Sequence, residues 1–216
     1  MKKLIFFFLS AFLFISLSGQ DATIKEEMIT FTTYDFGDPD PVARPGKIFP
    51  YFRFDGFSYT PVNKPQKMVV LENNWIKVWV APEIGGKIWG ALDKKNNQYF
   101  IYFNKVVKFR DIAMRGPWTS GGIEHNFGVI GHAPTVATPV DYHYQKNPDG
   151  SVSCFVGSLD LPSRTEWRVE IRLPNDKAWF EVTSYWNNPT DKKTSLYHWQ
   201  TAAADGTDDL QFFFPG

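Results

Sequence analysis

The chain has 216 residues, of which 43% are hydrophobic and 17% aromatic, and it carries 23 basic and 23 acidic side chains. Because these charges cancel, nothing in the sequence attracts a polyanion, and nucleic acid is not expected as a partner. Cys154 is the single cysteine and cannot form an internal disulfide. An ordinary hydrophobic core therefore has to hold the fold together.

The N-terminus has the layout of a Sec signal peptide. Lys2 and Lys3 precede an uncharged apolar run from Leu4 to Leu17, and small residues follow. This run is short for a membrane span, and no cysteine follows it that could carry a lipid anchor. We expect residues 1–19 to be removed on export to the periplasm or the extracellular space, with no stable membrane insertion afterwards. The alternative is an uncleaved anchor helix.

Residues 20–66 are polar at first and then rich in proline and aromatic residues. Prolines at this density argue against a helix and against central strands. The segment is expected to form an extended arm, or edge strands packed on the main body of the protein.

From residue 67 onward the sequence alternates between strand patterns and turn signals. "VDYHYQK" and "SVSCFVG" flank the turn "NPDG", and "RTEWRVEIRL" places apolar and charged residues on opposite faces. No segment after the signal peptide shows a helical period, so residues 67–216 predict an antiparallel β-sandwich. The apolar end "DDLQFFFPG" would leave a hydrophobic edge strand, and we therefore expect the sandwich to be truncated at the C-terminus.

The stretch "GPWTSGGIEHNFGVIGHAPT", residues 116–135, holds the first candidate site. In a strand, Glu124 would lie on one face and His125 on the other, so the two could not line one pocket. The surrounding glycines favour a loop, in which carboxylate and imidazole groups could meet one ligand.

Four interpretations of this stretch remain open. Glu124 could do acid–base work with His125 or His132, since glutamate and histidine are the usual side chains for it. The same three residues could bind a metal, or they could hold a sugar while Trp118 stacks on it. The fourth interpretation is a tight turn without a ligand. The spacing fits neither the helical H-E-x-x-H motif nor a paired-cysteine site, so no metal or other cofactor is expected.

A second candidate lies in "SLYHWQTAAA", which predicts a strand. Alternation places His198 on one face of it and Trp199 on the other. A lone histidine on a strand is more typical of a structural residue than of a catalyst.

Several segments together resemble the DUF5107 family. They are "VWVAPEIGGKIWGALDKKNNQYFIYFN", "RGPWTSGGIEHNFG", "DYHYQKNPDGSVSC" and the last stretch from "NNPTDKKTSLYHWQ" to the end. The resemblance implies an exported bacterial protein of a kind common in Bacteroidetes, often with tetratricopeptide repeats after the β-domain.

DUF5107 is in turn similar to the galactose mutarotase-like superfamily, which implies a twisted antiparallel β-sandwich and sugar chemistry. By this resemblance His198 becomes a candidate catalytic acid or sugar ligand. The local run "YHWQTA" departs from the epimerase pattern, and the epimerase general base, a glutamate on a late strand, would fall beyond Gly216. Glu124 has no counterpart as a catalyst in the epimerases.

The expected function is that of a carbohydrate-active domain. The substrate-binding residues would be Trp118, Glu124, His125, His132 and Trp199, with His198 as the catalytic candidate. An enzyme of this kind would act at an anomeric centre, as an epimerase or a glycosidase. The alternatives are a non-catalytic carbohydrate-binding module and a structural domain preceding tetratricopeptide repeats. The sequence does not identify any protein partner.

Overall fold

The computed structural model describes residues 21–37, 56–111, 117–128, 132–133 and 135–214. The expected signal peptide lies outside the described residues, as does much of the expected arm. The described residues form strands, turns and irregular connections, and no helix occurs among them. None of the described residues therefore belongs to a helix that could cross a membrane.

The larger sheet has eight strands in the order β14-β9-β4-β3-β2-β1-β6, with β5 paired to β4. It is a mixed sheet, because β1 and β6 run parallel while the other pairs are antiparallel. Its strands are β1 (Thr23–Tyr34), β2 (Val62–Glu72), β3 (Ile76–Ala81), β4 (Lys87–Asp93), β5 (Gln98–Ile101), β6 (Val106–Lys108), β9 (Ile123–Asn126) and β14 (Trp199–Ala202).

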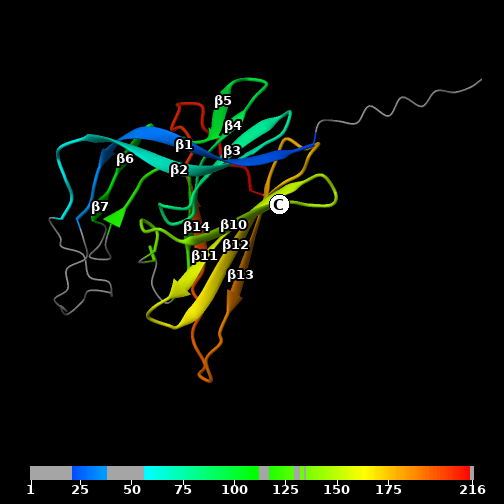
Figure 1. Ribbon diagram of the computed structural model, residues 1–216. Helices are drawn as coiled ribbons and strands as arrows, with labels where there is room; N and C mark the ends of the chain where they lie inside the picture. The colour runs from blue at the N-terminus through cyan, green and yellow to red at the C-terminus, as the bar shows by residue number, and fades with distance from the viewer. Residues whose placement is uncertain (1–20, 38–55, 112–116, 129–131, 134, 215–216) are drawn as a thin grey trace, which may run out of the picture.

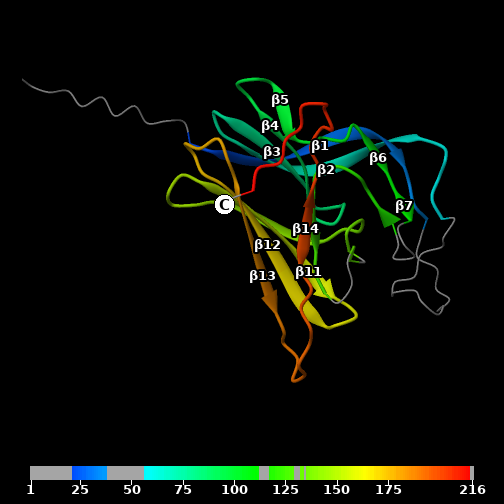
Figure 2. The same cartoon turned by 180° about the vertical axis from the view of Figure 1, so that it is seen from behind.

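The second sheet has four antiparallel strands in chain order. These are β10 (Asp141–Lys146), β11 (Val152–Asp160), β12 (Thr165–Leu173) and β13 (Glu181–Asn187), and a separate short pair joins β7 (Arg110–Asp111) to β8 (Pro117–Trp118). The four-stranded sheet lies toward the viewer in Figure 1, and β14 lies toward the viewer in Figure 2.

The main core lies between the two sheets. On β12, Trp167, Val169 and Ile171 are buried, while Glu166 and Arg168 point outward. The inward residues pack on apolar side chains of β2, β3, β4 and β11. Burying a side chain of this size stabilises the fold by about 1.5–3 kcal/mol, so this face alone fixes the register of β12.

A second apolar cluster covers the other face of the larger sheet. It includes Phe31, Met68, Val70, Trp79 and Trp89. Strand β2 is consequently buried on both faces over 68–71, which explains why its sequence there is a continuous apolar run rather than an alternating one.

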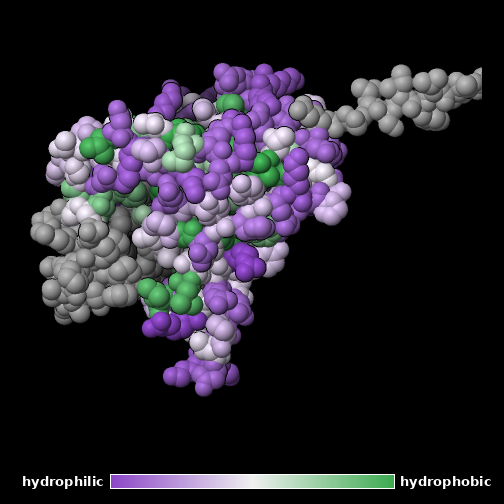
Figure 3. Space-filling model, viewed as in Figure 1, coloured by the Kyte–Doolittle hydropathy of each residue, from purple (hydrophilic) through white to green (hydrophobic). Residues whose placement is uncertain are grey.

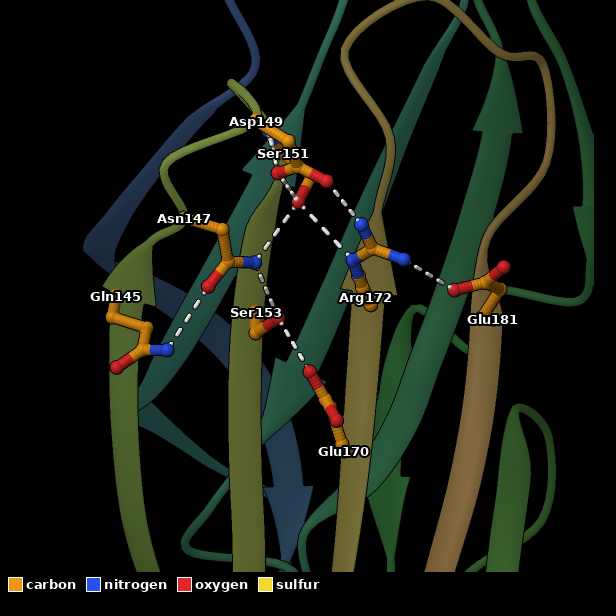
Figure 4. Close-up of polar contacts among 8 residues, drawn as sticks. All are labelled: Gln145, Asn147, Asp149, Ser151, Ser153, Glu170, Arg172 and Glu181. Carbon is orange, nitrogen blue, oxygen red and sulfur yellow. Dashed lines mark hydrogen bonds and ion pairs between the residues drawn. The ribbon is translucent and has the colours of Figure 1, made fainter.

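The outer face of the four-stranded sheet is polar. Asn147 Nδ2 donates to Ser153 Oγ at 2.8 Å, and Ser153 Oγ donates to Glu170 at 2.7 Å (Figure 4). Arg172 donates to Asp149 and to Glu181. Figure 3 shows this side of the molecule as mainly hydrophilic, with apolar residues in separate small groups. These contacts give the polar side chains at this end of the sheet hydrogen-bond partners within the protein.

The prediction of an all-β sandwich is confirmed. The expected hairpin at "NPDG" is β10–β11, with Asp141 opposite Gly157. In the first part of the expected arm, Thr23–Tyr34 forms strand β1, which pairs with β2 along almost its whole length and with β6 only over Thr32–Tyr34. These residues contain no proline, and proline-rich composition begins only after them.

Candidate functional site

Residues 123–126, expected as part of a loop, form strand β9. Ile123 pairs with Ile88 of β4, and the other edge of β9 pairs with β14. The glycines lie outside the strand and limit its length. Gly122 has φ 67° and Gly128 has φ 101°, and neither value fits an extended strand. Side chains on β9 must therefore alternate between the two faces of the larger sheet.

Glu124 lies at the centre of one face, and its side chain is buried. Its Oε1 accepts hydrogen bonds from His132 Nδ1 at 2.7 Å and from Asn126 Nδ2 at 2.8 Å. Among the described residues its Oε2 has no hydrogen-bond partner, although Glu124 is only 2% exposed. A buried carboxylate oxygen without a donor is costly, so this atom indicates a position for a ligand.

The segment carrying His132 is held against β9. Asn126 Oδ1 accepts a hydrogen bond from the Ala133 backbone N–H at 2.9 Å. His132 itself has φ 51°, a left-handed conformation that is unfavourable for a residue with a side chain. Such strain is typical of functional sites, and here it places the imidazole on the Glu124 carboxylate.

Two tryptophans surround His132. Trp199 pairs with Asn126 across the β9–β14 ladder, and its ring meets the His132 ring edge-on at 4.8 Å. Trp118 meets His132 at 6.1 Å, also edge-on. Among the described side chains, Trp199 Nε1 is buried and has no acceptor. The site therefore offers an unpaired acceptor on Glu124 and an unpaired donor on Trp199.

Lys87 is a buried charge that the sequence reasoning missed. It precedes Ile88, so the Ile88–Ile123 pair places Lys87 on the same face as Glu124. Its Nζ donates to Thr119 O at 2.8 Å and to Thr119 Oγ1 at 3.2 Å. Burial lowers the pKa of Lys87 to about 8, and the negative charge of Glu124 acts in the opposite direction. The sequence pattern that could have identified Lys87 is "GGKIWG", in which a lysine stands between two glycines and an apolar strand.

His125 and His198 lie on the opposite face of β9–β14. Gln200 Nε2 donates to His125 Nδ1 at 3.0 Å, so the side chains of Gln200 and His125 lie on the same face. His198 Nδ1 donates to Asn126 O at 2.9 Å, and its ring stacks on Phe127 at 4.2 Å. His198 therefore attaches the start of β14 to the core, away from Glu124.

The metal interpretation needs Glu124, His125 and His132 to converge. The structure brings Glu124 and His132 together and places His125 on the far face of the strand. Within the described part of the chain, no three His, Cys, Asp or Glu side chains are grouped as a metal site would require.

A hollow of about 610 Å³ lies elsewhere, over the outer face of the four-stranded sheet. It is lined by His143, Phe155, Gly157 and Arg168, among others, and it includes none of the predicted site residues. We place the candidate site at Glu124 because two of the three buried unpaired atoms of the described residues, Glu124 Oε2 and Trp199 Nε1, are there. The third, His125 Nε2, lies on the other face of β9, and none of the residues lining the hollow carries one.

His125 makes stability depend on pH. Burial lowers its pKa to about 3, and the charges of His198 and Lys87 act in the same direction. In the unfolded chain a histidine has a pKa of about 6.5, so below that pH the unfolded state takes up a proton that the folded state does not. We expect the free energy of unfolding to fall by about 2 kcal/mol between pH 7 and pH 5.

Urea unfolding at pH 7, 6 and 5 measures this fall. His125→Gln keeps a polar side chain beside Gln200 but cannot titrate. Its free energy of unfolding should therefore fall by about 2 kcal/mol less than that of the wild type between pH 7 and pH 5. An identical fall in both proteins would contradict the assignment to His125.

The fold and site define an all-β sandwich with a buried carboxylate–histidine pair between two tryptophans. The chain belongs to the DUF5107 family, described as a domain of unknown function, which matches residues 43–216. Its structure is similar to the crystal structure of a TPR-domain containing protein from Parabacteroides distasonis, with a TM-score of 0.77 and 24% sequence identity. That similarity covers 86% of this chain and 32% of the other, so this chain spans about a third of that protein's length.

Proposed function

We propose that this domain binds a carbohydrate on the Glu124 face of β9–β14. The observation that carries the proposal is the pair of buried unpaired atoms beside His132, Glu124 Oε2 and Trp199 Nε1. One needs a hydrogen-bond donor and the other needs an acceptor. A hydroxyl group supplies both, and a sugar presents several hydroxyls around an apolar ring face that suits tryptophan.

The Glu124–His132 pair also suits proton transfer. A carboxylate hydrogen-bonded to an imidazole at 2.7 Å orients the ring and can exchange a proton with it. If the bound sugar reacts, the chemistry is proton transfer at the anomeric centre, as in epimerisation or glycosidic cleavage. The resemblance of "PEIGGKIWGALD" to galactose mutarotase-like proteins supports this choice. His198 faces away from this site, so the proposal assigns proton transfer to Glu124 and His132.

A glycan array followed by calorimetry tests the proposal. Glu124→Gln replaces the free acceptor by an amide of the same shape and should weaken sugar binding by about tenfold or more, as expected for a charged hydrogen bond. Trp199→Phe keeps an aromatic ring, removes the N–H and should weaken binding by about fivefold.

Two variants serve as controls. Trp75→Phe changes an exposed tryptophan in the β2–β3 turn, and Glu166→Gln changes a residue in the hollow of the other sheet. Both should bind like the wild type. Loss of binding in Glu166→Gln, with Glu124→Gln unaffected, would move the sugar to the hollow and contradict the proposal.

A second candidate is a structural module of a larger exported protein, placed before tetratricopeptide repeats. The observation that favours it is the similarity to a longer TPR-domain containing protein, of which the match covers 32%. Absence of binding to any sugar on the array would leave this candidate. Export itself is checked by N-terminal sequencing of the mature protein, which should begin near residue 20.

A further inference from the structure

We propose that Lys87 is a further ligand-binding residue, and that one hydroxyl of a neutral sugar lies between Lys87 Nζ and Glu124 Oε2. The hydroxyl would accept a hydrogen bond from the ammonium group and donate one to the carboxylate. This inference rests on the proposed function and names the group of the sugar that the site recognises.

The strand register places the two charges on one surface. Ile88 and Ile123 are directly paired, so in an antiparallel ladder Lys87 and Glu124 are the next pair, on the opposite face of the sheet. Both residues are only 2% exposed. Two opposite charges are thus buried as cross-strand neighbours.

These neighbours nevertheless form no ion pair with each other, although both belong to the described residues. Lys87 Nζ makes its hydrogen bonds to Thr119 instead, through the backbone oxygen and Oγ1. An ammonium group has three N–H donors, and these two contacts use two of them. On the other side, Glu124 uses Oε1 for His132 and Asn126 and leaves Oε2 free.

One donor on Lys87 and one acceptor on Glu124 therefore make no hydrogen bond, although Lys87 Nζ also lies over the Trp89 ring, 5.7 Å from its centroid. A hydroxyl between them satisfies both at once and is neutral. A ligand carboxylate in this position would face the Glu124 charge, and a ligand ammonium would face the Lys87 charge. The pair of charges thus selects an uncharged hydroxyl and fixes the direction of its hydrogen bonds.

A monodeoxy sugar series tests the inference by calorimetry. The probes are methyl glucoside, methyl galactoside and methyl mannoside with their 2-, 3-, 4- and 6-deoxy derivatives, and the proteins are the wild type and Lys87→Met. For the glycoside that binds, removing one particular hydroxyl should weaken binding to the wild type by about tenfold. Lys87→Met should bind that deoxy derivative as tightly as it binds the parent glycoside.

The outcomes separate the two proposals. Suppose that the wild type binds a glycoside and that each deoxy change lowers the affinity of Lys87→Met by the same factor as that of the wild type. The role of Lys87 is then contradicted, and the proposed function stands. If the wild type binds neither the three parent glycosides nor any sugar on the glycan array, the proposed function itself is contradicted. Lys95→Met, on an exposed turn, is the matched control and should behave as the wild type.

A pH titration of the wild type decides the matter if Lys87→Met does not fold. The titratable groups around Lys87 are Glu124 and His132 on its own face and His125 behind β9. Burial lowers the pKa of Lys87 to about 8, so Lys87 loses its charge between pH 7 and pH 9.5. Affinity should fall by about tenfold between pH 7 and pH 9.5, and a constant affinity over that range would contradict the inference.

Discussion

Gly122→Ala is expected to lower the free energy of unfolding by about 3 kcal/mol or more. Gly122 has φ 67°, which disfavours any residue with a Cβ. A Cβ there would lie 2.1 Å from Ile88 O, a backbone atom of β4 that cannot move without breaking the ladder. Gly122 also donates to Tyr102 O and accepts from Ala203 N, so the change would disturb the whole approach to β9.

Urea unfolding of Gly122→Ala and Gly206→Ala provides the comparison. Nothing lies within 4 Å of a Cβ at Gly206, so this control should change the unfolding free energy by less than about 0.5 kcal/mol. Equal stability of the two variants would show that β4 and β9 do not approach each other as closely as described.

Trp167→Ala should lower the free energy of unfolding by about 3–5 kcal/mol. Trp167 is 3% exposed and stacks on Phe127 with ring centroids 4.9 Å apart. Phe127 in turn stacks on His198, so the cavity would also loosen the start of β14. Loss of this packing should appear as a changed imidazole signal of His198 in NMR spectra of the folded variant.

Trp179→Ala is the matched control for this core substitution. Trp179 is 47% exposed, and its loss should cost less than about 1 kcal/mol. Similar costs for Trp167→Ala and Trp179→Ala would contradict the placement of Trp167 in the core between the sheets.

Some strands could be predicted because their own residues carry the whole signal, either an alternation of apolar and charged side chains or a marked turn. In β12 the alternation of apolar and charged residues matches the buried and exposed faces residue by residue. The β10–β11 hairpin is marked by its turn residues, Pro148 to Gly150. In both cases the information that decides the structure lies within about ten residues.

Strand β9 was not predictable in this way. Its four residues include three polar ones, and glycines flank it on both sides. What makes it a strand is its pairing with β4 on one edge and with β14 on the other, some seventy residues later in the chain. Local propensity could not reveal contacts at that separation.

The same long-range pairing explains how the candidate site differs from expectation. Glu124 binds His132, and the rings of Trp118 and Trp199 meet the His132 ring. Alternation on β9 and β14 takes His125 and His198 to the other face, where they contact Gln200 and Phe127. Lys87 enters the site through β4, a strand whose apolar pattern indicated only a core role.

A crystal structure with a bound sugar would show directly whether the Glu124 face of β9–β14 is the binding site. The wild-type protein would be soaked with the tightest ligand from the glycan array. We expect sugar hydroxyls within hydrogen-bond distance of Glu124 Oε2 and Trp199 Nε1, two of the three buried atoms without partners among the described residues. A sugar bound in the hollow beside Arg168, with Glu124 untouched, would contradict this expectation.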